Sequence, residues 1–390
     1  MPNKDYTTAI LNLEDVKITN VENEIDTIHI YLELPRKEHI CPACGTVTNC
    51  VHDYRVQVIK DIPLGRNTYL HLKKRRYRCP ECGKRFAEKN SFLPRYQRKT
   101  NRLTASVINA FRKAHSATEI AEQYNISVST ALRIFDLVSY QPKELPEVLS
   151  IDEFKGNAGG QKYQTILTDL KKKKILDILP NRYEADLISY FKQFPSRMSV
   201  KYFVCDMNPH FRSVAKACFP KAKIVADKYH VVRQAVWAME RVRKEEQKKL
   251  SKRFRIYFKR SRYLLNKPKE TLTEDEMNRL ALMFEIAPRL ADAYRVKNEF
   301  IAAMRAGSSQ EGRKLLLCWL QSVNVLELPE FNACVTACYN WFQEILNSFD
   351  VPWTNGFTEG CNNKTKVLKR VCYGVRKFDR FRNRILHRAP

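Results

Sequence analysis

The sequence lacks long apolar runs and has few acids for its length. Of its 390 residues only 42 are Asp or Glu, and no stretch of about 18 consecutive apolar residues occurs, so no membrane span is expected. The first fifteen residues, MPNKDYTTAILNLED, lack the apolar centre of a secretory signal peptide. We therefore expect a protein of the reducing cytosol, where its twelve cysteines would bind metals or pack in cores rather than form disulfides.

Basic residues outnumber acidic ones by 27, because 69 Lys and Arg stand against 42 Asp and Glu. A solvated basic surface is one interpretation, but the charge is concentrated. Residues 71–102, 241–262 and 364–388 hold twelve, eleven and ten Lys or Arg, with two, two and one acids. Such an excess indicates a polyanionic partner, either nucleic acid or an anionic membrane. Three separate basic segments favour a long nucleic acid.

Two CPxCG motifs, at residues 41–45 and 79–83, flank predicted β structure. Residues 51–61 and 68–78 would form a hairpin around the turn PLGRN. Because C-x-x-C spacing lets two sulfurs reach one ion, the pair of motifs predicts a zinc ribbon with a structural Zn²⁺. The expected ligands are Cys41, Cys44, Cys79 and Cys82. Two disulfides or unused thiols are the alternatives.

Residues 101–139 have helical spacing, and TEIAEQYNISVSTALRIF within them fits a helix-turn-helix. The first helix is predicted at about 118–124 and the second at about 128–138. The side chains expected to face a DNA groove are Ser127, Ser129, Thr130 and Arg133. A plain helical hairpin is the alternative.

Apolar runs at 148–154, 163–170 and 173–180 predict three strands. A helix, a strand, a second helix and another strand follow before a long basic helix near residue 230. This order predicts a mixed sheet with helices on its faces. Residues 240–345 show only helical patterns.

Asp152 and Asp206 lie within or at the end of apolar strands. A carboxylate in such a place is costly unless it is paired or binds a metal. Two carboxylates on neighbouring strands suit Mg²⁺, which proteins hold with one or two carboxylates plus substrate phosphates. Chance placement is the alternative, because Asp169 and Asp177 also fall at strand-like positions. Glu153 should point to the opposite face by strand alternation.

The motif order, with SIDEF, VCDMNPHF, ADKYHVVRQ and NGFTEGCNNKTKVLKR following the ribbon and the helix-turn-helix, resembles bacterial insertion-sequence transposases of the family usually called ISL-three. The resemblance spans essentially the whole chain. It implies an α/β fold: an RNase H-like mixed-sheet catalytic core with an all-helical insertion. The expected domains are a zinc-ribbon β domain (1–95), a helix-turn-helix domain (96–140), the core (141–239 and 346–390) and the insertion (240–345).

Carried over by motif, the resemblance implies the catalytic acids Asp152, Asp206 and Glu359. They would hold two Mg²⁺ or Mn²⁺ ions. Lys366 and Arg370 would follow Glu359 along one helical stripe and hold the DNA backbone. A solvated basic helix with an incidental glutamate is the alternative.

The roles of two further residues stay open. His230, in the family signature DKYH, would touch DNA or orient water near the active site, or it is simply a packed histidine. Trp353, just before the Glu359 helix, would pack in the core or stack on a flipped base.

The resemblance implies a DDE transposase that binds the terminal inverted repeats of its insertion sequence. It would cleave the element ends by two-metal phosphodiester hydrolysis and join the 3′-OH ends to double-stranded target DNA. The family logic implies a homodimer on paired ends, with no membrane partner, in the bacterial cytosol at the nucleoid. The alternatives are a DNA-binding regulator without chemistry, and an RNase H-like nuclease or resolvase without strand transfer.

Overall fold

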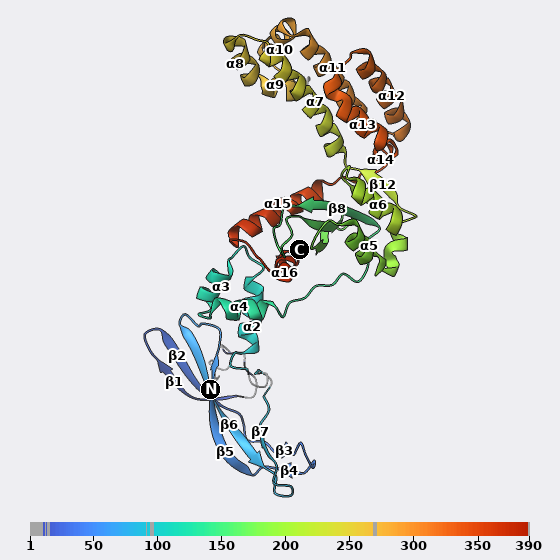
Figure 1. Cartoon of the computed structure of the whole chain (residues 1–390). Coiled ribbons are helices and arrows are strands. Elements are labelled where there is room, and N and C mark those ends of the chain that lie inside the picture. The colour runs from blue at the N-terminus through green and yellow to red at the C-terminus, as the bar shows by residue number, and fades with distance from the viewer. Residues whose placement is uncertain are drawn as a thin grey trace, which may run out of the picture. The chain divides into compact units, whose positions relative to one another are not determined.

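The computed structural model describes residues 11, 13, 16–90, 92–93, 97–267 and 271–388. The chain forms two compact units (Figure 1). Unit 1 comprises residues 1–140, 368–375 and 379–388, and unit 2 comprises residues 141–367, 376–378 and 389–390. The expected domain boundary at 95/96 lies outside the described residues. Among the described residues, every helix is too short or too polar to span a bilayer.

A five-stranded sheet forms the first part of unit 1, in the order β1-β2-β6-β5 with β7 paired to β6. The predicted hairpin is confirmed: β5 and β6 pair antiparallel, and Gly65 in the turn has a φ of +75°, a conformation that favours glycine. One face buries an apolar core that includes Leu70 and Leu72. The strands are β1 (Lys17–Asn23), β2 (Thr27–Glu33), β5 (Val51–Lys60), β6 (Asn67–Arg78) and β7 (Arg85–Ala87), beside a small ribbon of β3 (His39–Ile40) and β4 (Val47–Thr48).

Three helices follow: α2 (Asn101–Ala110), α3 (Ala117–Gln123) and α4 (Val128–Phe135). Ser116 and Glu119 form a capping box that starts α3. Asn125 in the turn has a φ of 46°, which asparagine tolerates better than most residues. The two predicted helices are confirmed, although α4 ends three residues before the predicted 138.

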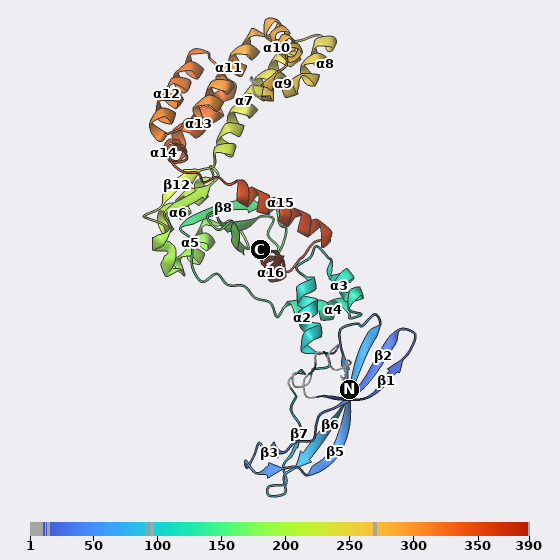
Figure 2. The same ribbon diagram turned by 180° about the vertical axis from the view of Figure 1, so that it is seen from behind.

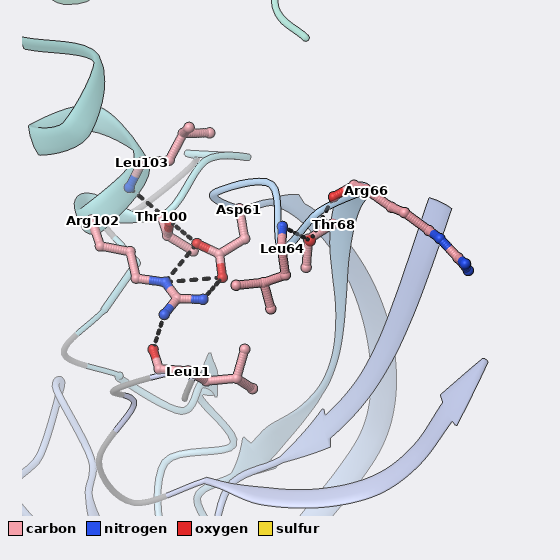
Figure 3. A network of polar contacts seen from close by, with 8 residues as sticks. All are labelled: Leu11, Asp61, Leu64, Arg66, Thr68, Thr100, Arg102 and Leu103. Atoms are coloured by element: carbon pink, nitrogen blue, oxygen red, sulfur yellow. Dashed lines mark hydrogen bonds and ion pairs between the residues drawn. The ribbon is translucent and has the colours of Figure 1, made fainter. Parts of the chain in front are cut away.

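A buried ion pair ties the end of β5 to the start of α2 (Figure 3). Asp61, which is fully buried, accepts hydrogen bonds from Thr100 Oγ1 at 2.6 Å and from Arg102 Nε at 2.8 Å. Thr100 Oγ1 in turn accepts from the Leu103 N–H and caps α2. Because Asp61 is shielded from water, removing Arg102 would leave a buried charge unpaired, at a cost of about 3–5 kcal/mol.

The C-terminal helix α16 (Phe378–Arg388) packs on the helix-turn-helix within unit 1. Arg380 makes a bidentate ion pair with Asp136, at 2.6 and 2.7 Å. His387 Nε2 lies 2.8 Å from the Ile108 carbonyl oxygen, and Phe381 is buried. Residues expected to complete the catalytic core thus contribute to the packing of the DNA-binding helices.

Unit 2 is built on a mixed five-stranded sheet in the order β10-β9-β8-β11-β12. β8, β9 and β10 are antiparallel neighbours, whereas β11 and β12 continue the sheet parallel to β8. The predicted mixed α/β sheet is confirmed. Its strands are β8 (Val148–Phe154), β9 (Gln164–Asp169), β10 (Lys174–Leu179), β11 (Tyr202–Cys205) and β12 (Lys223–Ala226).

Strand alternation divides the residues of this sheet between two sets of helices. Leu149 and Ile151 join the core formed with α5 (Glu184–Lys192) and α6 (Pro209–Cys218). Ser150 and Asp152 instead hydrogen-bond to α15 (Gly356–Val371) on the other face. Both views show α15 running beside β8 (Figures 1 and 2). The face occupied by α15 is therefore the face that collects the polar residues of the strands.

The segment between β12 and α15 is mainly helical where it is described, as predicted for residues 240–345. Residues such as Val242, Phe300 and Trp319 share one apolar core. The helices are α7 (Lys228–Lys248), α8 (Lys252–Arg260), α9 (Arg262–Asn266), α10 (Glu274–Ile286), α11 (Pro288–Ala303), α12 (Ser309–Val325), α13 (Asn332–Asn340) and α14 (Phe342–Asn347).

Candidate functional site

The two CPxCG motifs bring four thiols together, as predicted. Their sulfur atoms all lie within 4.8 Å of one another, and the set consists of Cys41, Cys44, Cys79 and Cys82. The separations across the motifs are 3.6 Å for Cys41–Cys82 and 3.4 Å for Cys44–Cys79. A tetrahedral zinc ion with Zn–S bonds of about 2.3 Å would place sulfurs about 3.8 Å apart. The cluster therefore fits a structural Zn²⁺.

Local hydrogen bonds favour thiolates at the first motif, whereas, despite the opposing Lys84 N–H, hydrogen bonds among the thiols raise the pKa of Cys82 to about 12. The side chain and backbone N–H of Thr46 hold the pKa of Cys44 down to about 6. Backbone N–H groups of Ala43 and Cys44 lower the pKa of Cys41. Since the thiolate is the form that binds metal, these contacts prepare the site for a cation.

The helix-turn-helix residues fall at the start of α4. Ser127 caps the helix, because its Oγ accepts a hydrogen bond from the Thr130 N–H at 3.2 Å. Ser129 and Arg133 are exposed, and Thr130 is half-buried. Ser127 thus has a structural role, whereas Ser129 and Arg133 are accessible to DNA.

Asp152 lies near the end of β8 with 8% of its surface exposed. Its Oδ1 accepts from the Glu153 N–H and its Oδ2 from Asn362 Nδ2 of α15, each at 2.8 Å. Burial, with the charge of Asp206 adding to it, raises the pKa of Asp152 to about 7. Burial thus outweighs the opposing charge of His230 at this carboxyl.

Asp206 follows directly after β11, which pairs in parallel with both β8 and β12. Its Oδ1 accepts from the Asn208 N–H at 3.2 Å. Burial raises the pKa of Asp206, an effect that the positive charge of His230 opposes. The two aspartates thus sense each other electrostatically, as expected for acids on neighbouring strands.

His230 stands in the first turn of α7 and is anchored by Asp227. Its Nδ1 lies 2.7 Å from Asp227 Oδ2, and this hydrogen bond raises the pKa of His230. Asp227 is almost fully buried and also accepts from the Asn355 N–H at 3.4 Å. His230 is therefore anchored by Asp227 in the first turn of α7, and a positive charge on its ring opposes the rise in pKa of both aspartates.

A buried hydroxyl network sets the position of α15 on the sheet. Thr358 Oγ1 lies 2.9 Å from Ser150 Oγ and 2.7 Å from Thr168 Oγ1. Ser150 also donates to the side chain of Asn355. Because these groups are buried, each depends on the others for hydrogen bonding. The helix is thereby fixed in register with β8 and β9.

Glu359 follows Thr358 and is half-buried. Its side chain does not close a compact ligand cluster: among the described residues, the only group of three or more His, Cys, Asp or Glu with ligand atoms within 4.8 Å of one another is the four-thiol set. Lys366 and Arg370 lie further along α15 and are exposed. The two aspartates stand on neighbouring strands, and Glu359 lies on α15, whose Asn362 bonds to Asp152.

The competing acids have structural partners. Asp169 accepts from the Lys171 and Lys172 N–H groups at 3.0 Å in the turn after β9. Asp177 accepts from the Tyr190 hydroxyl at 2.8 Å. Glu153, as predicted, leaves the Asp152 face, and it pairs with an arginine at 2.7 Å.

Of the two alternatives for Trp353, the structure shows packing in the core. It is partly buried and packs against the apolar cluster that includes Val148, Val204 and Val225.

Comparison with protein families decides the assignment. Residues 149–385, more than half of the chain, match the family model of the ISL3 DDE domain, described as a transposase. The chain belongs to the ISL3 family of transposases. Residues 37–82 match the zinc-finger of transposase IS204/IS1001/IS1096/IS1165, and residues 88–139 match the helix-turn-helix domain of transposase family ISL3. The resemblance stated from the motifs is thus confirmed, with its zinc ribbon and its DNA-binding helices.

Curated proteins are similar to this chain over different lengths. A transposase for insertion sequence element IS1001 from Bordetella parapertussis is 26% identical over 377 residues, covering 91% of this chain and 90% of its own. A transposase for insertion sequence element IS1557 from Mycobacterium tuberculosis is 29% identical over 118 residues, 30% of this chain and 26% of that protein. An ATP-dependent protease from Lactococcus lactis is 30% identical over 103 residues, 26% of this chain and 31% of that protein.

The sequence analysis did not predict several residues that contact Asp152 or α15. Asn362 was overlooked, although it bonds directly to Asp152. Ser150 and Thr168 were also overlooked. Both are fully buried hydroxyl residues, and strand alternation, which puts Ser150 on the face of Asp152, was the available signal for Ser150.

Proposed function

We propose that this member of the ISL3 family is an active DDE transposase that cuts the ends of its insertion sequence and joins the 3′-OH ends to target DNA. The observation that supports the proposal most is the meeting of Asp152 and Asp206 beneath α15, where burial raises both pKa values. Two buried carboxylates of this kind need a cation to be charged at neutral pH. Double-stranded DNA, as a polyanion, matches the excess of 27 positive charges.

The donor set fits a divalent metal. Asp152 and Asp206 offer hard oxygen ligands, which Mg²⁺ and Mn²⁺ prefer, and Glu359 would supply the third carboxylate from α15. Bound cations would activate water and stabilise the leaving 3′ oxygen. Asn362 would hold Asp152 in one orientation through its 2.8 Å hydrogen bond, as outer-shell partners of metal ligands do.

Other residues of the chain would act on the DNA itself. His230, anchored by Asp227, would hold a phosphate oxygen or orient water. Lys366 and Arg370, exposed on α15, would contact the backbone of the strand. Ser129, Thr130 and Arg133 of α4, with the zinc ribbon, would bind the terminal inverted repeats. Two copies would pair the two ends as a homodimer on nucleoid DNA in the bacterial cytosol.

The topology supports an RNase H-like core. Three antiparallel strands followed by two strands parallel to the first, with acids after the first and fourth, give the order 3-2-1-4-5. The helical segment between β12 and α15 would then be the insertion that separates Asp206 from Glu359.

Single-turnover cleavage of DNA that carries the element's terminal repeats tests the proposal. With Mg²⁺ or Mn²⁺, wild type should nick the ends, and Asp152→Asn, Asp206→Asn and Glu359→Gln should each lose at least about 10³-fold in rate because charge stabilisation is lost. All three should still bind the repeats. Glu147→Gln, which removes a surface ion pair of unit 2, should cut normally.

The alternatives give different results. A regulator without chemistry would bind the repeats and cut nothing in any form. A nuclease would cut but would never join the ends to a target plasmid. Retained nicking by Glu359→Gln would remove Glu359 from the site while leaving the aspartates in place.

A further inference from the structure

The first three turns of α7 present an aromatic and cationic stripe to solvent. Tyr229, Arg233 and Trp237 follow one another at intervals of four residues, so they lie along one side of the helix. Tyr229 is 56% exposed and Trp237 47% exposed. Large aromatic side chains usually bury most of their surface, so two of them exposed on one helical stripe call for a partner.

Arg233 connects the two rings. Its guanidinium carbon lies 5.6 Å from the centroid of the Tyr229 ring and 4.7 Å from that of Trp237. Both distances are in the range of cation–π contacts. Its Nε is shielded from solvent, and no described residue accepts a hydrogen bond from it. The arginine is thus held by the rings and keeps its charge uncompensated.

The stripe begins at the aspartate site. Tyr229 precedes His230, and their rings pack edge to face at 5.6 Å and 87°. His230 is anchored by Asp227, and a positive charge on its ring acts on Asp206. α7 starts where β12 ends, and β12 is the parallel neighbour of the strand that leads to Asp206. A DNA strand cut at the aspartates would therefore pass the start of α7.

We propose that Tyr229, Arg233 and Trp237 form a stacking platform for unpaired nucleotides of the DNA strand that is cut. This inference rests on the proposed function for the identity of the strand. Unpaired bases expose π-faces that stack on aromatic rings and on guanidinium planes, whereas a duplex hides them. The charge of Arg233 suits the adjacent phosphates. Four residues advance a helix by about 6 Å, so the stripe offers three stacking surfaces in a row.

Binding of a fluorescein-labelled oligo(dT) single strand to the full zinc-loaded chain, followed by anisotropy in buffer without added Mg²⁺ or Mn²⁺, tests the platform without any cleavage. Trp237→Ala and Tyr229→Ala should each weaken single-strand binding about tenfold or more. Binding of a blunt duplex with the terminal repeats should change less than twofold. Trp237→Phe and Tyr229→Phe should restore most of the lost affinity, because a ring is retained.

The matched control is Tyr339→Ala, which removes an equally exposed tyrosine from α13 and should leave both affinities unchanged. Zinc content and melting temperature of each variant confirm that it is folded. Unchanged oligo(dT) binding by folded Trp237→Ala, or an equal loss for single strand and duplex, overturns the platform.

The two proposals fail separately. If Asp152→Asn cuts like wild type, the proposed chemistry is wrong, but the oligo(dT) result is unaffected because it is measured without Mg²⁺ or Mn²⁺. If Asp152→Asn is inactive while Trp237→Ala binds oligo(dT) normally, the transposase activity stands and the platform is wrong.

Discussion

The four-thiol cluster of unit 1 and the aspartate site of unit 2 are opposite solutions to cation binding. In the cluster all sulfurs lie within 4.8 Å, and local N–H groups lower the pKa of two thiols. In the aspartate site the two acids come from neighbouring strands, and burial raises the pKa of both. The first arrangement fits a structural metal, whereas we propose that the second is completed only when DNA and divalent metal bind. Four experiments test this difference between the two sites.

The largest expected effect is at the cluster. Cys44→Ser should lower zinc from one ion per chain to nearly none and unfold the ribbon, because structural zinc contributes about 10 kcal/mol or more to such domains. Metal analysis and binding to the terminal repeats measure both losses. Cys50→Ser, which removes an exposed thiol outside the cluster, is the control and should retain zinc. Full zinc content in Cys44→Ser would refute the ligand assignment.

Metal binding at the aspartate site should depend on pH between 5 and 7. Because the pKa of Asp152 is raised to about 7, a proton competes with the metal below pH 7. Affinity for Mn²⁺ at this site, measured by calorimetry on zinc-loaded protein, should fall up to tenfold per unit as the pH drops from 7 to 5. Asp152→Asn should bind weakly with little pH dependence. A wild-type affinity that is flat across this range would contradict the raised pKa.

Removing one hydroxyl should loosen α15 without touching a ligand. Thr358→Val keeps the shape of the side chain but leaves Ser150 and Thr168 without their shared partner, which costs about 1–3 kcal/mol. Cleavage should slow tenfold to a hundredfold, while binding to the repeats is unchanged. Thr365→Val, at another buried position of α15, is the matched control. Equal effects of the two variants would mean that the network does not position Glu359.

The smallest expected effect is on the melting temperature of the protein without divalent metal. A raised carboxyl pKa means that the charged form destabilises the folded state, and this penalty appears as the pH rises from about 4 to about 7. Asp152→Asn should therefore raise the melting temperature of metal-free unit 2 by a few degrees at pH 8 and hardly at all at pH 5. Scanning calorimetry at both values checks the sign. A lower melting temperature at pH 8 would show that the charge is compensated.

Much of the fold was predictable because apolar residues recur with one period in helices and another in strands. The strands of unit 2 are continuous apolar runs, and the helices of residues 240–345 show regular spacing. The thiol cluster was predictable for the same reason, since its spacing is local. Asp152 and Asp206 were predictable because charge is unusual in a buried strand.

The rest depends on tertiary geometry. The spacing after Glu359 does not say which side of α15 meets β8, so the contact of Asn362 with Asp152 was not predicted. The position of α16 was not predictable either, because an amphipathic helix can join any apolar surface that it reaches. Its bond partners, such as Asp136, lie more than two hundred residues earlier in the chain.

The packing of α16 on α2 and α4 has a consequence during synthesis. A ribosome makes the helix-turn-helix early and α16 only after the sheet, the helical segment and α15. The partner surface of the DNA-binding helices is thus completed only when translation nears residue 388. A polypeptide that stops early would carry every recognition residue of α4 without the helix that supports them, so abortive products should compete poorly with the finished enzyme for the ends of the element.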